Sequence, residues 1–373
     1  MGVLITNSNV YVTKPTLPEL GEYVKHLQVV WDSAQVTNGG QYLKRFEAIL
    51  SEYLGVKHAV LVSNGTLAIQ LAIKALGVQG KVLSTPFSFV ATTSAVHWLG
   101  LDVKFADIDA RSLCMSPAKI RGQMDSEVSA ILATHIFGNP CDVEAIAEIG
   151  REWGVPVIYD AAHTFGVSLN QQGIMNFGDL SILSLHATKL FHSVEGGVVT
   201  TNDDELAARL RRMRNFGYDD SGEIMDVGIN AKMSELHAAF GVSLFPTIHV
   251  EMEARLRLFN LYNKNLKNCH RVRRPEWHSQ ASQNGAYYPL IVDSEALLLE
   301  LLGELKLMGV HARRYFYPAL SRLDYVKGED CPLAQDLATR VLCLPLFGKL
   351  EQHIVAEICD VVQRVSNGKV LHE

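Results

Sequence analysis

The sequence predicts an α/β protein with a mostly parallel sheet, followed by a smaller α+β lobe. Short apolar runs alternate with amphipathic helical segments as far as residue 245, and the pattern changes beyond that point. Apolar strands separated by helices are typical of a sheet that is covered on both faces. We therefore expect a large domain over residues 1–245 and a small C-terminal domain over residues 246–373.

Composition narrows the class of protein. A chain of 373 residues with 48% hydrophobic content can bury a large core. The net charge of -6 argues against a nucleic-acid partner. Neither a leader pattern nor an apolar run of the ~20 residues that span a bilayer is present, so we expect a cytoplasmic protein without membrane contact. The six cysteines form no CxxC pair, which favours buried thiols over a metal site or disulfides.

The N-terminal segment carries Pro15 and Pro18 and then a helical stretch over 20–30. Gly39 and Gly40 follow, and they allow close approach of a ligand or a neighbouring subunit, or simply connect two helices. Apolar residues at helical spacing predict a further helix from Tyr42 to Tyr53.

Seven apolar runs predict the strands of the sheet, at 58–62, 82–84, 103–106, 130–133, 155–159, 180–184 and 197–200. Helical segments are expected between several of them, at 67–76, 92–99, 143–153 and 204–213. In a parallel sheet, ligands gather at the carboxyl ends of the strands. Residues 63–66, Asp160 and residues 184–189 should therefore converge at one edge.

The C-terminal part has a different pattern. A long helix is expected at 250–266, a strand-like run at 286–292, and helices at 297–308 and 352–365. This mixture predicts the smaller α+β lobe.

Two residues at strand ends indicate chemistry. Lys189 follows the apolar run that ends at Ser184, and loss of hydration there favours the neutral amine that reacts with an aldehyde cofactor. Asp160 ends another apolar strand. Pyridoxal phosphate needs this pair, a lysine for its aldehyde carbon and an acid that keeps its pyridine nitrogen protonated.

The stretch Ser63-Asn64-Gly65-Thr66 leaves a strand and opens a helix. Free backbone N–H groups and the helix dipole make such a turn suitable for a phosphate. The plainer interpretation is a helix N-cap without a ligand. The stretch matches neither the P-loop nor the dinucleotide-binding motif, which weakens nucleotide-fold interpretations.

Five motifs in combination resemble the DegT/DnrJ/EryC1/StrS family of nucleotide-sugar aminotransferases, which have the aspartate aminotransferase fold (fold type I). They lie at residues 63–66, 85–92, 160–163, 184–197 and 228–233. The resemblance covers nearly the whole chain, from residue 37 to the C-terminal lobe. It implies a seven-stranded, mostly parallel sheet and pyridoxal 5'-phosphate as the cofactor.

The resemblance also implies roles for individual residues. Lys189 would hold the cofactor and transfer protons, and Asp160 would contact the pyridine nitrogen. His163 would lie near the phenolic oxygen, and Phe89 would stack on the ring. Without the resemblance, Phe89 is an ordinary core aromatic and His163 equally a structural histidine.

The phosphate would be held by residues of two chains. The resemblance assigns Gly65, Thr66 and Ser184 of one subunit and Asn230 of a second subunit to this group. It therefore implies a homodimer with shared active sites.

The segments 184–197 and 313–318 are most similar to family members that aminate C4 of a dTDP-4-keto-6-deoxyhexose. The resemblance thus implies transfer of the amino group of L-glutamate, giving a sugar for a surface polysaccharide such as lipopolysaccharide O-antigen. Arg313, Arg314 and Tyr317 are candidates for substrate binding, because a pyrophosphate or a carboxylate needs a guanidinium. The two arginines are otherwise solvated charges.

Three alternatives stay open. A C3-aminating transaminase differs only in the position of the new amino group. Sugar dehydratases that resemble this family typically carry histidine in place of the lysine, so Lys189 counts against them. A regulatory dimer that binds the cofactor without turnover is the third.

The sequence differs from the usual sequence of the family at Leu185 and at residues 241–246.

Overall fold

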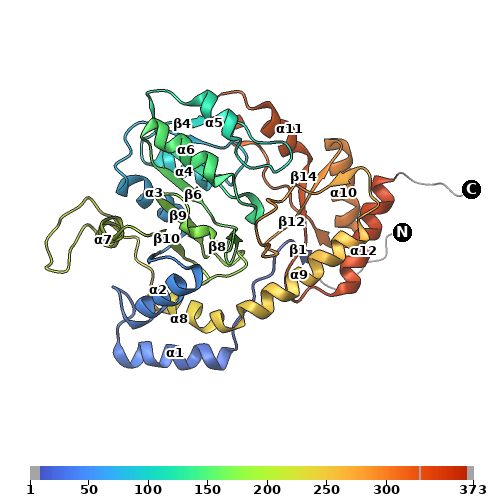
Figure 1. Cartoon of the computed structure of the whole chain (residues 1–373). Helices are drawn as coiled ribbons and strands as arrows, with labels where there is room; N and C mark the ends of the chain where they lie inside the picture. Colours follow the sequence, from blue (N-terminus) through green and yellow to red (C-terminus); the bar gives the residue numbers. More distant parts are fainter. Residues whose placement is uncertain (1–8, 327–328, 368–373) are drawn as a thin grey trace, which may run out of the picture.

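The computed structural model describes residues 9–326 and 329–367. A seven-stranded sheet lies at the centre of the larger lobe (Figure 1). Its order is β2 (His58–Val62), β10 (Gly197–Thr201), β9 (Leu180–Ser184), β6 (Val157–Asp160), β5 (Val128–Thr134), β3 (Lys81–Ser84) and β4 (Val103–Phe105). β10 runs antiparallel to both neighbours, and the other adjacent pairs are parallel. The predicted fold class is confirmed.

Both faces of the sheet are covered. Every residue of β6 and β10 is buried, and successive side chains of a strand point to opposite faces. The helices of this lobe that follow its strands are α3 (Gly65–Ala75), α4 (Ala91–Trp98), α5 (Pro117–Gln123), α6 (Val143–Trp153) and α7 (Asp204–Met213). The predicted helices at 143–153 and 204–213 have these same bounds.

Short elements complete the larger lobe. They are β7 (Ser168–Leu169), β8 (Gln172–Gly173) and the 3-10 turns η1 (Ile136–Gly138), η2 (Ile174–Asn176) and η3 (Phe245–Thr247). A further 3-10 turn, η4 (Leu320–Arg322), belongs to the C-terminal part of the chain.

The N-terminal helices form a layer beside the sheet. They are α1 (Leu20–Ser33), at the bottom of Figure 1, and α2 (Gln41–Leu54), and both pack against α8 (Glu235–Leu244). The loop between α1 and α2 contains Gly40, where an added Cβ would lie 2.6 Å from the carboxylate of Glu235. That carboxylate accepts hydrogen bonds from the backbone N–H groups of Tyr42 (2.7 Å) and Leu43 (3.0 Å), so a buried acid caps α2. Gly40 therefore makes room for an internal cap.

The smaller lobe has its own core and a three-stranded antiparallel sheet. The sheet consists of β11 (Val272–Arg273), β12 (Tyr288–Val292) and β14 (Val341–Leu344). The helices around it are α9 (Ile248–Asn265), α10 (Glu295–Leu307), α11 (Pro332–Arg340) and α12 (Gln352–Ser366). The α+β character expected for this part is thus present.

The chain enters this smaller lobe twice. β1 (Val10–Tyr11) pairs in parallel with β13 (Val310–His311), and Val10 is buried in the core of the smaller lobe. The segment between β1 and α1 then leads into the larger lobe. The division at residue 245 stays a prediction, and it does not include this N-terminal strand in the small domain.

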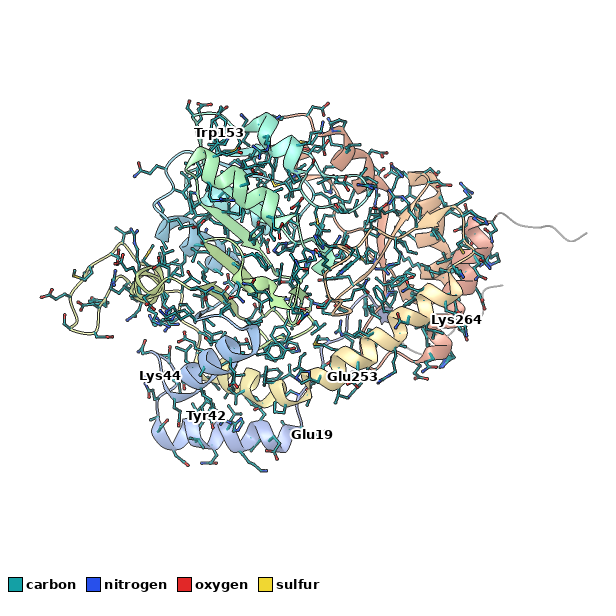
Figure 2. All side chains as sticks on the ribbon, in the orientation of Figure 1. Glu19, Tyr42, Lys44, Trp153, Glu253 and Lys264 are labelled. Carbon is teal, nitrogen blue, oxygen red and sulfur yellow. The ribbon has the colours of Figure 1, made fainter. Side chains whose placement is uncertain are left out.

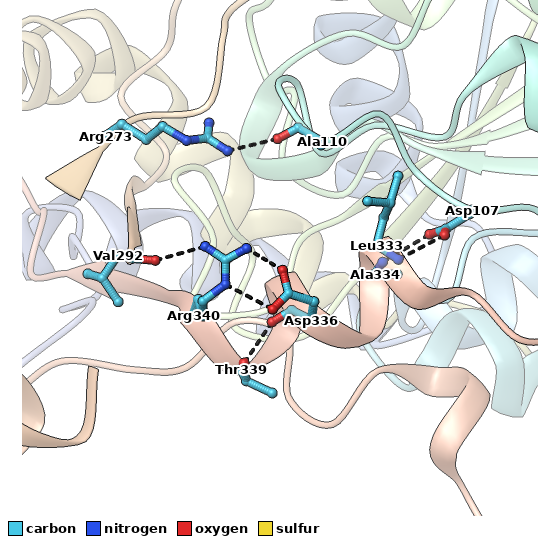
Figure 3. Close-up of polar contacts among 9 residues, drawn as sticks. All are labelled: Asp107, Ala110, Arg273, Val292, Leu333, Ala334, Asp336, Thr339 and Arg340. Atoms are coloured by element: carbon cyan, nitrogen blue, oxygen red, sulfur yellow. Dashed lines mark hydrogen bonds and ion pairs between the residues drawn. The ribbon is translucent and has the colours of Figure 1, made fainter. Parts of the chain in front are cut away.

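Polar contacts join the two lobes (Figure 3). The Asp107 carboxylate, after β4, accepts hydrogen bonds from the backbone N–H groups of Leu333 (3.0 Å) and Ala334 (2.9 Å) at the start of α11. Arg273 donates to the carbonyl oxygen of Ala110 at 3.0 Å. The larger lobe thus caps a helix of the smaller one.

Helix α9 continues from one lobe into the other, with Glu253 in its first half and Lys264 near its end (Figure 2). Arg255 in this helix is fully buried, and its guanidinium donates to Glu251 at 2.6 Å and to the carbonyl oxygen of Leu346 at 3.1 Å. Glu251 also accepts the N–H of Gly348 at 2.9 Å. A buried ion pair therefore ties α9 to the loop after β14.

All six cysteines are buried free thiols, as predicted. Cys114, Cys141, Cys331 and Cys343 belong to the large core around the seven-stranded sheet, and Cys269 and Cys359 belong to the core of the smaller lobe.

Candidate active site

A cavity of about 360 Å³ opens at the carboxyl ends of the parallel strands. The structure brings eight of the predicted residues to its lining: Gly65, Thr66, Phe89, Asp160, His163, Ser184, Lys189 and Arg313. Parallel strands end at the same edge of a sheet, and β6 ends at Asp160 while β9 ends at Ser184. Residues far apart in the sequence therefore meet in one cavity.

Lys189 lies in the loop between β9 and β10. Its backbone N–H donates to the carbonyl oxygen of His186 at 2.9 Å, and Ala187 donates to that of Val194 at 2.7 Å. Burial lowers the pKa of Lys189 from 10.5 to about 8, while Asp160 acts in the opposite direction and Arg313 adds to the lowering. A neutral amine is therefore accessible near neutral pH.

Asp160 is buried, and its carboxylate is held from two sides. Oδ2 accepts the hydroxyl of Thr92 at 3.0 Å, and Oδ1 accepts the N–H of Ala162 at 3.1 Å. Burial raises the pKa of Asp160, against the lowering effects of Ala162, Lys189 and Thr92. The Thr92 hydroxyl also lies 2.8 Å from that of Ser88, which extends the hydrogen-bonded chain away from the carboxylate.

The turn before α3 forms a narrow cradle. The side chain of Asn64 accepts the N–H of Leu67 at 2.9 Å and so caps the helix, as the plainer interpretation expected. A Cβ at Gly65 would lie 3.2 Å from Cβ of Ser184. The first turn of α3 thus lies beside Ser184 at the cavity, and the free N–H groups of a helix N-terminus make an anion site compatible with the cap.

His163 is buried and neutral. The backbone N–H of Phe137 donates to its Nδ1 at 3.2 Å, which places the ring hydrogen on Nε2. Burial lowers the pKa of His163 well below its usual value, and Lys189 adds to this effect. The ring is parallel to that of Phe316 at 6.0 Å between centroids. Phe89, by contrast, is 47% exposed at the cavity and is not a core aromatic.

Of the two predicted arginines, Arg313 faces the cavity and Arg314 does not. The Arg314 guanidinium donates to Glu295 at 2.6 Å and to the carbonyl oxygen of Thr339 at 3.3 Å. It also lies 3.6 Å from the ring centroid of Tyr317, which is likewise outside the cavity lining. The structure thus separates Arg314 and Tyr317 from the other predicted residues.

Asn230 lies outside the cavity of its own chain. It is exposed and follows the loop 215–229, which projects beside α7 at the left of Figure 1. Apolar side chains on this loop are exposed, among them Val227 at 92%.

Several lining residues were not predicted as site residues. Tyr287, Tyr315 and Phe316 come from the smaller lobe, and His186 and Glu195 come from the Lys189 loop. The sequence signal for the last two was their place in the motif itself, Leu-His-Ala-Thr-Lys followed by Glu-Gly-Gly. Tyr287 gave no such signal, because it lies within an apolar strand-like run.

Within residues 9–326 and 329–367, no cluster of three or more His, Cys, Asp or Glu side chains could hold a metal ion. No helix in this part of the chain has the length and apolarity required to cross a bilayer.

The sequence matches known enzymes over nearly its full length. A dTDP-4-amino-4,6-dideoxy-D-glucose transaminase from Shigella dysenteriae is 38% identical over 362 residues, which cover 95% of this chain and 99% of the relative. An Escherichia coli protein of the same name is 34% identical, with 96% and 99% covered. A GDP-perosamine synthase from Vibrio cholerae is 30% identical, with 95% and 99% covered.

The fold has a similar counterpart among solved structures. The crystal structure of DesI in the presence of its TDP-sugar product has a TM-score of 0.92 and 30% identity, and covers 97% of this chain and 94% of that chain. A family model described as the DegT/DnrJ/EryC1/StrS aminotransferase family matches residues 19–363. With the site geometry and the relatives above, this match means that the chain belongs to the DegT/DnrJ/EryC1/StrS aminotransferase family.

Proposed function

We propose that the protein is a pyridoxal 5'-phosphate-dependent aminotransferase that moves the amino group of L-glutamate to C4 of a dTDP-4-keto-6-deoxyhexose. The observation that carries this proposal is the convergence of Lys189, Asp160 and the α3 cradle on one cavity. The sugar and the position of amination are supported by the names of the two transaminase relatives.

The residues fit this cofactor. The absence of a Cβ at Gly65 leaves space beside Ser184 for a phosphate group at the helix N-terminus. The Asp160 carboxylate accepts two hydrogen bonds and keeps acceptor capacity for a protonated ring nitrogen. When bound, pyridoxal phosphate supplies an aldehyde that takes up an amino group and a ring that accepts the electrons of a broken C–H bond.

Lys189 has two tasks in this proposal. Its amine, with a pKa lowered to about 8, would hold the cofactor through the aldehyde carbon. The same amine, when it is free, would move a proton from one carbon atom to the other as general base and acid. His163, with its ring hydrogen on Nε2, would hold the phenolic oxygen, and Phe89 would stack on the ring.

Arg313 supplies the positive charge that both substrates need. Its guanidinium faces the cavity and would bind the carboxylate of L-glutamate or the pyrophosphate of the sugar nucleotide. Arg314 and Tyr317 remain proposed substrate contacts, and Arg314 would have to leave Glu295 to reach a ligand.

A homodimer completes the site in this proposal. Asn230 lies outside its own cavity and would reach the cofactor phosphate of the partner. Exposed apolar side chains on α1 and on the 215–229 loop support an interface there, among them Leu20, Trp31, Ile224 and Val227. Mixing Lys189→Ala with Asn230→Ala chains should restore activity that neither variant has alone, because one site of the mixed dimer is intact.

The proposal is tested with the purified protein and candidate keto sugars. Wild-type protein should be yellow with the cofactor and should form 2-oxoglutarate from L-glutamate only when a keto sugar is present. Lys189→Ala should lose both properties. A Lys189→Ala variant that retains turnover would exclude the proposed role of this lysine.

The product decides between the proposed reaction and its alternatives. NMR of the sugar distinguishes an amino group at C4 from one at C3. A mass that corresponds to loss of water without gain of nitrogen would instead indicate a dehydratase. No turnover with any keto sugar, despite bound cofactor, would favour the regulatory dimer.

A further inference from the structure

The Lys189 loop contains a histidine that the proposed reaction does not use. His186 lines the cavity, and its side chain is 47% exposed. Its Nδ1 accepts the backbone N–H of Thr188 at 3.2 Å and lies 2.8 Å from the Thr188 hydroxyl. The His186 ring thus contacts Thr188, the residue immediately before Lys189.

The backbone of His186 acts on the same turn. Its carbonyl oxygen accepts the N–H of Lys189 at 2.9 Å. The direction in which the Lys189 side chain leaves the loop therefore depends on a turn with two ties to His186, one through the imidazole and one through the carbonyl.

The tautomer of this imidazole follows from its contacts. A backbone N–H can only donate, so Nδ1 must be the unprotonated nitrogen and the ring hydrogen is on Nε2. Nε2 lies 3.6 Å from Oε1 of Glu195, whose side chain is 52% exposed on the other arm of the loop. A carboxylate at this position favours the tautomer with hydrogen on Nε2 and so keeps Nδ1 free to accept.

We propose that His186 is a positioning residue for Lys189, which acts through the Thr188 N–H, and that Glu195 orients its ring. The inference rests on the proposed aminotransferase function of Lys189. It gives the spacing of the motif a physical reason, since the histidine must precede the lysine by one turn and the acid must follow across the loop.

Asparagine provides the matched test. The Asn Oδ1 atom can accept the Thr188 N–H much as Nδ1 does, whereas alanine cannot. His186→Ala should slow the single-turnover reaction of the cofactor-loaded protein with L-glutamate by about 10- to 100-fold, and His186→Asn should recover most of that loss. KM for both substrates should change little.

A second measurement needs neither cofactor nor substrate. Hydrogen–deuterium exchange of the peptide that contains residues 186–189 should be about five- to tenfold faster in His186→Ala than in wild type and near wild type in His186→Asn. His353→Ala is the control, because His353 is another exposed histidine near a carboxylate, 3.2 Å from Glu351, outside the site. It should change neither measurement.

The outcomes separate the two proposals. If His186→Asn is as slow and as exchange-prone as His186→Ala, or if His186→Ala behaves like His353→Ala, the positioning role is wrong. A higher KM for the sugar with unchanged rate and exchange would make His186 a substrate contact and overturn the inference. If wild type transfers no amino group, the proposed function fails, while the exchange comparison still decides what His186 does to the turn.

Discussion

At the level of single residues, three neighbours favour the charged form of the Asp160 carboxylate, and one of them is a hydroxyl. Burial raises its pKa, and three neighbours oppose that shift, the N–H of Ala162 and the side chains of Lys189 and Thr92. Thr92 is fully buried and donates to Oδ2 at 3.0 Å. This threonine lies in a motif of the sequence, but its contact with Asp160 arises only when α4 and β6 pack together.

Removing that hydroxyl should weaken the site. Thr92→Val keeps the shape of the side chain and leaves the buried carboxylate with one donor fewer, so kcat should fall about five- to tenfold. Thr92→Ser, which retains a hydroxyl, should stay close to wild type. Steady-state kinetics with L-glutamate measures both, and equal activities of the two variants would contradict the role of the hydroxyl.

Lys189 should give the cofactor-free protein a pH-dependent nucleophile. Its folded-state pKa is lowered from 10.5 to about 8, so the neutral amine forms as the pH rises through about 8. The rate of reaction with pyridoxal, followed by absorbance, should rise with a midpoint near that pH and should be lost in Lys189→Ala. Exposed lysines would give a midpoint near pH 10.4 instead.

The lowered pKa of Lys189 also makes the free energy of unfolding depend on pH. Between pH 8 and 10.5 the unfolded chain binds more protons at this lysine than the folded protein does. The contribution of Lys189 to the free energy of unfolding therefore increases with pH across this window.

Some site residues could be predicted from the sequence, and others could not. Lys189 and Asp160 were predictable as a pair because both follow apolar strands, and parallel strands bring their carboxyl ends together. Arg313 and Arg314 were not distinguishable, because neighbours in an irregular segment point in different directions. The choice between them depends on Glu295, an acid of α10 that lies near Arg314 only in the folded chain.

At the level of elements, close packing of β10 on the turn before α3 shapes the cradle at the start of this helix. A Cβ at Gly197 would collide with the carbonyl oxygen of Asn64, the residue that caps α3. The second glycine of Glu195-Gly196-Gly197 therefore lets the strand lie directly behind the helix N-terminus.

Two glycine substitutions should have opposite effects. Gly197→Ala should lower the free energy of unfolding by about 1–3 kcal/mol, because it forces the α3 cap to move. Gly303→Ala, in the middle of α10 with nothing within 4 Å of the added Cβ, should raise it by about 0.5–1 kcal/mol. Urea unfolding measures both, and destabilisation by Gly303→Ala would contradict the packing explanation.

Elements with a clear apolar period were predictable, and α8 shows why others were not. Eight of its ten residues are buried, so no polar stripe faces solvent, and Gly241 lies against the ring of Phe46. A helix that is buried on nearly all sides lacks the 3.6-residue alternation of apolar and polar residues by which helices are recognised. Strand β1 has only two residues, and its partner β13 lies about three hundred positions later in the sequence.

At the level of the whole molecule, a buried ion pair lies in α9, the helix that continues from one lobe into the other (Figure 1). Arg255 and Glu251 lie in α9, and both contact the loop that follows β14. Burial acts against the charge of Glu251, but Arg255 and the N–H of Gly348 hold the pKa of this carboxyl below its usual value. The pair therefore fixes the course of α9 between the lobes.

Breaking this pair on one side should be costly. Arg255→Met leaves a buried carboxylate without its partner and should lower the free energy of unfolding by about 3–5 kcal/mol. Arg255→Met combined with Glu251→Gln should be more stable than Arg255→Met alone, because no uncompensated charge remains. Urea unfolding followed by circular dichroism tests this order, and the reverse order would contradict it.

Because both cores contain buried free thiols, the rate of thiol alkylation reports how often each core opens. Iodoacetamide can reach these sulfur atoms only when the surrounding core opens. Cys114 and Cys141 would report on the larger lobe, and Cys269 and Cys359 on the smaller one. Mass spectrometry of carbamidomethylated peptides over time would therefore rank the two lobes by their opening rates, without any engineered label.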